Sequence, residues 1–278
     1  IAAHHRVHEF SQAAHAVADG ALQSMNKRLV ISLAALLGWL LITVVAGQIR
    51  SGGHGQLSDA VSRGLGWPFL LAALFLLAVV AWQRWGDIGL NKLATGRSRL
   101  LTWLPLLYIV VGLGLAVVFG LPPVGVLLWV LFNSLLVGLS EELMFRGVLL
   151  QAFRHTVSIW PAVWLTTLAF GAIHTLNVFL TGDLRTASIQ SAAAALSGLL
   201  FIALRLRTGS LWPCIVVHGL WDFATFTLAV ARDGGSPGSS GGPTTLMTFV
   251  PILLVLPNGL YGLWLMRHIG RTHTQADS

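Results

Sequence analysis

The chain has 278 residues, of which 55% are hydrophobic and only 10% are charged, and its mean hydropathy is +0.76. Soluble globular domains carry about 25% charged residues, so this composition excludes an ordinary soluble enzyme and indicates a protein that crosses a membrane several times. A single cysteine, Cys214, excludes a disulfide framework and a cysteine-based metal cluster.

The net charge of +7 does not indicate a nucleic-acid partner. The basic residues are scattered in short loops between apolar runs, and no basic stripe with interleaved aromatic residues occurs. This distribution favours contact with anionic lipid head groups. Many of the tryptophans lie near the ends of apolar runs, as anchors at membrane–water interfaces do. We therefore expect the lipid bilayer as a partner, and no nucleic acid.

The two ends of the chain are expected to lie outside the bilayer. Residues 1–28 are polar and are expected to be a cytoplasmic segment that forms an amphipathic helix. The spacing of His5, His8 and His15 partly fits one helix face, which together with His4 leaves a metal site as an alternative. Residues 269–278 are expected to be a C-terminal tail.

Apolar runs long enough to cross a membrane follow one another between these ends. Each has about 18 residues or more, enough to cross a hydrocarbon core of about 30 Å at 1.5 Å per residue. Backbone groups in lipid must pair internally, so the spans are helical. We predict an all-α, polytopic transmembrane bundle of about eight helices, forming a single domain over residues 29–268. The expected spans are 29–49, 65–83, 101–120, 124–152, 157–180, 187–206, 210–230 and 245–266.

Lysine and arginine residues in the short loops orient the spans, because cytoplasmic loops carry an excess of them. One set of loops and span ends is strongly basic: Lys27, Arg28, Arg84, Lys92, Arg97, Arg99, Arg146, Arg154, Arg205, Arg207, Arg267 and Arg271. The alternate loops carry only Arg50, Arg63, Arg185 and Arg232. Both termini are therefore predicted to be cytoplasmic. The Gly- and Ser-rich stretches 51–55 and 233–243 are expected to be flexible outer linkers.

The stretch Ser140–Gly147, reading S-E-E-L-M-F-R-G, ends the fourth apolar run. A charge near the bilayer interior costs about 2.5–3.5 kcal/mol on insertion scales, so three charged residues here indicate a functional site. Glu142 and Arg146 are four residues apart and can pair on one helix face. Glu141 points about 100° away and is free to act on water as a general base. The alternative is a structural ion pair at a helix end.

Two further stretches place polar residues inside apolar helices. In the fifth span, Phe170, His174 and Asn177 share one helix face, and Gly171 permits close helix approach. In the seventh span, His218 and Asp222 lie four residues apart. This second pair could bind a metal, orient an imidazole or stabilise an oxyanion. The alternative for each stretch is a hydrogen bond that only ties helices together.

Together the three stretches offer carboxylates, imidazoles and an amide from three helices. Such a set can polarise a water molecule and stabilise a tetrahedral oxyanion, as hydrolysis of a peptide bond requires. The familiar soluble protease patterns H-E-x-x-H and G-x-S-x-G do not account for it.

In this order the motifs resemble the CPBP family, the CAAX protease and bacteriocin-processing (Abi) family of intramembrane endopeptidases, which includes the type II CAAX prenyl endopeptidases. The resemblance covers about residues 101–230. It rests on Glu-Glu-x-x-x-Arg at Glu141, Glu142 and Arg146, on Phe-x-x-x-His at Phe170 and His174, and on His-x-x-x-Asn/Asp at His218 and Asp222.

The resemblance implies a helical bundle whose site opens toward the cytosol. It implies that Glu141 and His174 activate the attacking water and that His218 and Asp222 bind or polarise the carbonyl oxygen or complete a metal site. Glu142, Arg146, Phe170 and Asn177 would support them. A divalent metal such as zinc, held by Glu141, His174 and His218, and a metal-free glutamate mechanism are both described for the family. Asp222 stands where the prenyl-protease branch usually has Asn, and an ionised Asp cannot donate to an oxyanion.

We therefore predict an intramembrane endopeptidase, a hydrolase that cleaves a membrane-associated or lipidated protein or peptide. The expected location is a bacterial or archaeal cell membrane, crossed several times. One alternative is a non-catalytic protein of the same fold, acting in bacteriocin immunity or regulating a partner. A proton-coupled transporter is the other, disfavoured because no strong internal repeat occurs. The sequence carries no signal for an oligomeric state.

Overall fold

The computed structural model of the chain describes residues 27–52, 57–91, 100–233 and 245–269, and within them the regular secondary structure is entirely helical. An N-terminal helix, Lys27–Ser51, ends in η1 (Ile42–Ala46) and α2 (Gly47–Ser51). The helices that follow are α3 (Leu57–Ser62), α4 (Trp67–Gln83), α5 (Trp103–Phe119), α6 (Val124–Glu142), η3 (Leu143–Leu149), α7 (Leu150–Arg154), α8 (Ile159–His174), η4 (Thr175–Asn177), α9 (Val178–Thr181), α10 (Leu184–Thr208), α11 (Trp212–Asp233) and α12 (Thr245–Met266).

The prediction of an all-α polytopic bundle is confirmed. Each of the expected spans contains a helix, and seven helices of the described chain are long and apolar enough to cross a membrane. The remaining apolar helix, α4, has 17 residues and is shorter. The expected amphipathic helix with His4, His5, His8 and His15, most of the expected linkers and the C-terminal tail lie outside the described residues.

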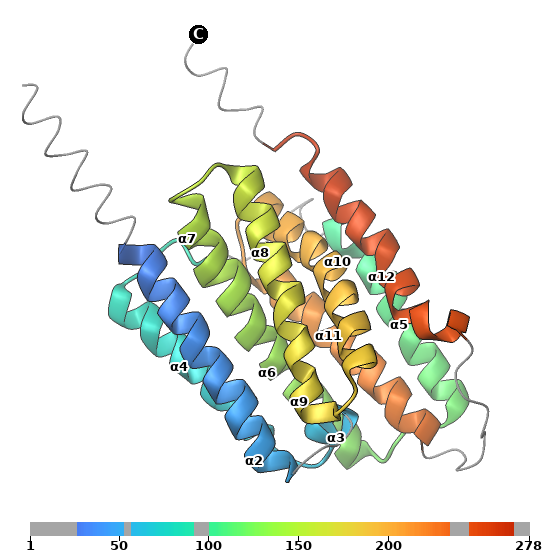
Figure 1. The fold of residues 1–278 in the computed structure, drawn as a ribbon. Helices are drawn as coiled ribbons and strands as arrows, with labels where there is room; N and C mark the ends of the chain where they lie inside the picture. The colour runs from blue at the N-terminus through green and yellow to red at the C-terminus, as the bar shows by residue number, and fades with distance from the viewer. Residues whose placement is uncertain (1–26, 53–56, 92–99, 234–244, 270–278) are drawn as a thin grey trace, which may run out of the picture.

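The helices run alternately up and down, so the bundle has two distinct ends (Figure 1). The start of the N-terminal helix and the end of α12 lie at the same end (Figure 1). This basic end carries Lys27, Arg28, Arg84, Arg154, Arg205, Arg207 and Arg267. The opposite end, called here the Ser51 end, carries Arg50, Arg63, Arg185 and Arg232. The basic residues are therefore concentrated at one end of the bundle in space, as their positions along the chain predicted.

Glycines bring the central helices into close contact. A Cβ atom on Gly138 of α6 would lie 2.8 Å from the carbonyl oxygen of Ile215 in α11, and one on Gly219 would lie 3.2 Å from the carbonyl oxygen of Ser134. In α8, a Cβ on Gly171 would lie 2.9 Å from the Cβ of Ala195 in α10. Small residues of this kind let helix backbones approach in membranes. The α6–α11 contact therefore lies within one turn of both Glu141 and His218.

The fourth expected span is one helix from Val124 to Arg154, and the segment η3 within it is wound as a π-helix. At 1.5 Å per residue its 31 residues extend about 46 Å, which is longer than a hydrocarbon core of about 30 Å. The π-helical segment begins directly after Glu142. Such segments are frequent at functional sites because they shift the facing of the side chains that follow.

Polar side chains fix the loops at both ends. Near the Ser51 end, the buried amide of Asn133 donates to the carbonyl oxygens of Val61 and Gly64 and accepts from the backbone N–H of Gly66. At the basic end, Arg28 lies 2.8 Å from Asp87 and 2.9 Å from His155. These contacts tie the connection before α4 to α6, and the N-terminal helix to the loops after α4 and α7.

Candidate functional site

Glu142, Arg146 and His218 form a buried ionic core between α6 and α11. Oε1 of Glu142 accepts from Nη1 of Arg146 at 2.9 Å and from Nδ1 of His218 at 2.7 Å. The side chains of Glu142 and Arg146 are both fully buried. Nη2 of Arg146 also lies 3.3 Å from the carbonyl oxygen of Gly198 in α10. The i, i+4 pairing expected from the sequence therefore exists, and it also holds one nitrogen of His218.

Two aromatic rings enclose this core. The guanidinium carbon of Arg146 lies 4.1 Å from the ring centre of Phe170 and 5.1 Å from that of Phe201. Phe201, on α10, stacks on the imidazole of His218 with ring centres 4.9 Å apart and an interplanar angle of 11°. Sequence reasoning missed Phe201, because a phenylalanine in an apolar span carries no local signal of its partner.

Glu141 faces the Nε2 atoms of His174 and His218 rather than Glu142 and Arg146. Its Oε2 lies 3.9 Å from Nε2 of His174 and 3.8 Å from Nε2 of His218. These distances are too long for direct hydrogen bonds, and Oε2 is buried without a hydrogen-bond partner among the described residues. The side chains of Glu141 and His174 are 17% and 19% exposed, whereas Glu142 is fully buried. The two adjacent glutamates therefore occupy different environments.

The tautomer of His174 follows from its one close contact. Nδ1 lies 2.8 Å from the carbonyl oxygen of Phe170. A carbonyl oxygen only accepts, so Nδ1 carries a proton and donates it. In the neutral ring, Nε2 is then an acceptor, and it is the nitrogen that faces Glu141.

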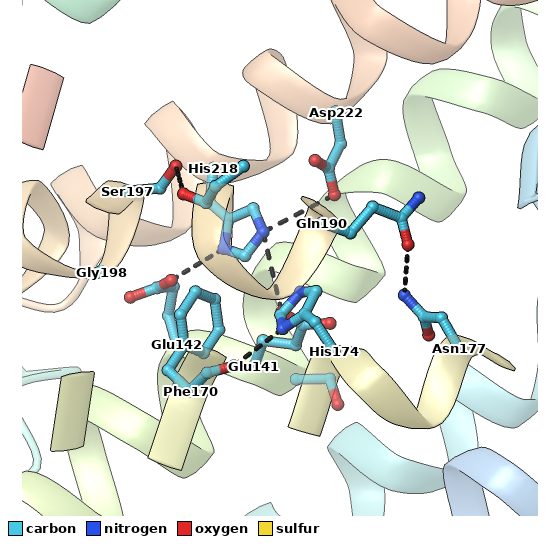
Figure 2. Close-up of polar contacts among 12 residues, drawn as sticks. Glu141, Glu142, Phe170, His174, Asn177, Gln190, Ser197, Gly198, His218 and Asp222 are labelled. Atoms are coloured by element: carbon cyan, nitrogen blue, oxygen red, sulfur yellow. Dashed lines mark hydrogen bonds and ion pairs between the residues drawn. The ribbon is translucent and has the colours of Figure 1, made fainter. Parts of the chain in front are cut away.

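Figure 2 shows that the side chains from the three motifs point toward one another. His218 uses Nδ1 to contact Glu142, so that Nε2 is directed toward Glu141 and toward Oδ2 of Asp222 at 3.6 Å. The convergence of the motif residues from α6, α8 and α11, expected from the sequence, is therefore present in the structure.

Three further polar residues adjoin this cluster. Nδ2 of Asn177, in η4, donates to Oε1 of Gln190 of α10 at 3.1 Å (Figure 2). The indole N–H of Trp39, in the N-terminal helix, donates to Oγ of Ser140 at 2.7 Å. Sequence reasoning missed Gln190, Trp39 and any role for Ser140. Gln190 lies among other polar residues at the start of α10, so its polarity gave no signal, and none pointed to Trp39.

A cavity of about 90 Å³ reaches Glu141 and His174. Its polar lining is Thr43, Ser140, Glu141, His174 and Asn177. Its apolar walls are Trp39, Leu40, Val44, Phe69, Val137, Ile173, Leu176 and Leu180. This volume holds several water molecules or a small aliphatic side chain. The N-terminal helix therefore forms one wall of the space in front of Glu141.

The possible metal ligands do not form a metal site in this arrangement. Among the described residues, no group of three or more His, Cys, Asp or Glu side chains is placed to hold a metal ion. Glu141, His174 and His218 are close neighbours but are not gathered as a ligand set.

Comparison with known families gives one match. Residues 123–224 match the family model described as Type II CAAX prenyl endopeptidase Rce1-like. The match covers 102 of the 278 residues. The match lies within the segment 101–230 that resembled the CPBP family, and it contains the motif residues from Glu141 to Asp222. No curated protein matches the chain significantly.

The apolar helices indicate a multi-pass membrane protein, and the Rce1-like match over residues 123–224 supports a CAAX-type membrane protease in general. The matched segment begins with α6 and ends within α11. The N-terminal helix, which supplies Trp39 and Thr43 to the cavity, lies outside it.

Proposed function

We propose that this protein is an intramembrane endopeptidase in which Glu141 and His174 activate a water molecule. The supporting observation is the position of Oε2 of Glu141, just under 4 Å from Nε2 of His174. Such a separation lets both atoms contact one water molecule. Ionised Glu141 and neutral His174 both present acceptors, so the two hydrogens of that water point at them and its oxygen lone pairs point away, toward a substrate.

Hydrolysis then proceeds through the water oxygen. Glu141 or His174 takes a proton from water as the oxygen attacks the peptide carbonyl carbon. The carbonyl oxygen becomes an oxyanion, to which Nε2 of His218 donates a hydrogen bond when both nitrogens of the ring carry a proton. Collapse of the tetrahedral intermediate breaks the C–N bond, and the departing amine receives the proton held by the base. Hydrogen bonds to such an oxyanion are a large part of the rate enhancement of acyl transfer.

Glu142 and Arg146 act through His218 rather than on the substrate. The contact of Glu142 with Nδ1 holds the imidazole plane, and Arg146 neutralises Glu142 in the buried core. Phe201 fixes the opposite face of the ring by stacking. Oδ2 of Asp222 lies 3.6 Å from Nε2 of His218, and its negative charge favours the protonated ring that donates to the oxyanion. Asn177 is an accessory polar group of the cavity wall.

The substrate proposed for this site is a membrane-associated or lipidated peptide, with the C-terminal CAAX prenyl peptide as one member of that class. The cavity at the site is lined largely by apolar side chains, which suits a segment that arrives from the lipid phase. The host membrane is proposed to be a bacterial or archaeal cell membrane, with both termini in the cytoplasm.

The test is cleavage of a panel of membrane peptides by the purified protein in detergent. Wild type is compared with Glu141→Ala and His174→Ala, each with and without a chelator. Cleavage by wild type that is lost in both variants is the expected result. Cleavage that persists in Glu141→Ala would refute the assignment of the base. Loss of wild-type cleavage with the chelator would instead show that a metal takes part.

A further inference from the structure

We propose that the carboxamide side chains of Asn177 and Gln190 bind the backbone of the peptide beside the scissile bond. Together they recognise one extended residue, whose N–H donates to Asn177 and whose carbonyl oxygen accepts from Gln190. This inference rests on the proposed function, to which it adds a binding subsite. Gln190 has no place in the motifs that carry the family resemblance, and Asn177 has only a supporting one.

The first argument is what the contact between the two side chains leaves unused. Nδ2 of Asn177 donates to Oε1 of Gln190 at 3.1 Å. A carboxamide has one oxygen that accepts and one nitrogen that donates. The contact therefore leaves Oδ1 of Asn177 as an acceptor and Nε2 of Gln190 as a donor. With both carboxamides turned over the two roles exchange, and the pair still presents one acceptor and one donor.

An extended peptide offers the matching groups. In an antiparallel ladder, a residue of a hydrogen-bonded pair uses both its own N–H and its own C=O toward one partner. The Asn177–Gln190 pair presents the acceptor and the donor that such a residue needs. The contact between the two side chains is only partly buried, so both carboxamides remain accessible to a ligand.

The second argument is the position of Asn177 beside the proposed water-activating residues. Asn177 lines the same cavity as Glu141 and His174. It follows His174 by three residues, at the end of the 3-10 segment η4. A rise of about 1.5–2.0 Å per residue places it about 4.5–6 Å further along. An extended peptide advances about 3.3 Å per residue, so the residue that Asn177 binds lies one or two positions from the scissile bond.

The third argument is that Gln190 lies on the face of α10 that packs against the site. Positions 190, 194, 198 and 201 fall on one side of a helix, because they are three or four residues apart. On this face, the carbonyl oxygen of Gly198 contacts the buried ionic core, and the ring of Phe201 stacks on His218. Gln190 therefore continues the α10 wall of the site by about three turns from Phe201.

A purely structural role explains less of this arrangement. Figure 2 shows the side chain of Gln190 between those of Asp222 and Asn177. One hydrogen bond between Asn177 and Gln190 is enough to hold η4 against α10. The remaining donor and acceptor are costly in an apolar surrounding unless water or a ligand pairs with them. A peptide residue in the site pairs with both.

Binding of ester-containing peptides tests the pair without hydrolysis. The background is Glu141→Gln, which keeps the bound peptide intact. The probes are a fluorescent prenylated tetrapeptide and a fluorescent transmembrane peptide, each with one backbone amide at a time replaced by an ester. An ester removes the N–H and keeps the shape of the backbone. Dissociation constants are measured in detergent micelles.

We expect one ester position to weaken binding by about 2–10-fold, the effect of one hydrogen bond. This penalty should vanish when Asn177→Leu is added. Gln190→Met should weaken binding of the all-amide probe by a similar factor, because the donor to the carbonyl oxygen is lost. Gln83→Met, the same change at the end of α4, is the matched control and should leave both the affinity and the ester penalty unchanged.

Three results would overturn the inference: no ester position that weakens binding, an ester penalty of the same size in Asn177→Leu, or no binding of either probe. The second is the result that a purely structural pair predicts. If size exclusion shows that Asn177→Leu is misfolded, Asn177→Ser replaces it, because its side chain is too short to reach the peptide. Cleavage by wild type is scored separately. Probes that bind with the expected pattern but are not cleaved would refute the proposed function and leave the subsite standing.

Discussion

The two halves of the bundle differ in how far their charged side chains are buried, and the boundary between the halves falls between the adjacent residues Glu141 and Glu142. Toward the basic end, Glu142 and Arg146 are fully buried, paired and surrounded by apolar side chains. Toward the Ser51 end, Glu141, His174 and Asp222 border a cavity and remain partly exposed. A buried charge without a partner strongly destabilises the fold, whereas a side chain that activates water must be accessible to water. Glu141 and Glu142 are adjacent in the sequence but point into opposite halves, because a helix turns about 100° per residue.

His218 joins the two halves. Its Nδ1 contacts Glu142 in the half toward the basic end, called here the packed half. Its Nε2 faces Glu141 and Asp222 in the half toward the Ser51 end, called here the open half. Disturbing the packed half should therefore alter the geometry of the open half, whereas conservative changes in the open half should leave stability nearly unchanged.

The largest expected effect separates activity from stability in the open half. Glu141→Gln removes the proposed base and should lower the cleavage rate by about 10²–10⁴-fold, the usual contribution of general acid–base catalysis. Its melting temperature should change little, because Glu141 makes no direct hydrogen bond among the described residues. Peptide cleavage and thermal unfolding in detergent measure the two effects. Asp59→Asn, which changes a carboxylate outside the site, is the matched control and should leave cleavage intact.

The converse effect is expected in the packed half. Arg146→Met leaves the carboxylate of Glu142 without its cationic partner and should cost about 3–5 kcal/mol of unfolding free energy. The double variant Glu142→Gln/Arg146→Met removes both charges and should recover part of that loss. Denaturant unfolding in mixed micelles measures both. Equal stability of the single and double variants would show that the pair is not the source of the effect.

A smaller effect on both stability and cleavage is expected from a change in the N-terminal helix. Trp39→Phe keeps the ring contact with Phe145 but removes the hydrogen bond to Ser140, which directly precedes Glu141. Loss of a buried hydrogen bond of this kind costs about 1–3 kcal/mol. The variant should also lower kcat more than it changes KM, if Ser140 positions Glu141. Trp82→Phe, at a residue that is 76% exposed, should change neither quantity.

The smallest effect is expected at the basic end, from the Arg28–Asp87 pair. Burial opposes ionisation of Asp87, but the hydrogen bond and charge of Arg28 outweigh it, so its pKa lies below the ordinary value of 3.8. The pair therefore stabilises the fold fully above pH 3.8, and the stabilisation is lost as the pH falls through the lowered pKa. Because the carboxylate is 40% exposed, the contribution should be only about 0.2–1 kcal/mol.

Comparison of wild type with Asp87→Asn measures that contribution. The two proteins should differ in unfolding free energy at neutral pH and converge in acid. A difference that stays constant down to the lowest pH tested would mean that the carboxylate charge is not responsible.

Much of the fold and the cluster could be predicted from the sequence. Apolar runs of sufficient length can only be helices in lipid, so the elements followed directly from composition and length. The rarity of Glu141, Glu142, His174, His218 and Asp222 in such runs singled them out, and the structure brings them together. Their spacing also predicted the Glu142–Arg146 pair, because side chains four apart meet on a helix.

Other features have no trace in local spacing. The stacking of Phe201 on His218 and the bond from Trp39 to Ser140 join residues that are far apart in the chain. One apolar or aromatic residue in a span resembles another until its neighbours are known. The π-helical turn after Glu142 and the close approach of Gly138 and Gly219 set the distances of the site, and both depend on how helices pack.

The sequence by itself determined that this chain crosses a membrane as a helical bundle and that a small set of polar residues lies within it. The reason is energetic, since backbone groups without hydrogen bonds and charged side chains without a function both cost too much free energy in lipid. Only the tertiary structure decided which glutamate lies in the packed core and which one faces the cavity. Those outcomes depend on the packing of side chains from distant segments, which no local pattern encodes.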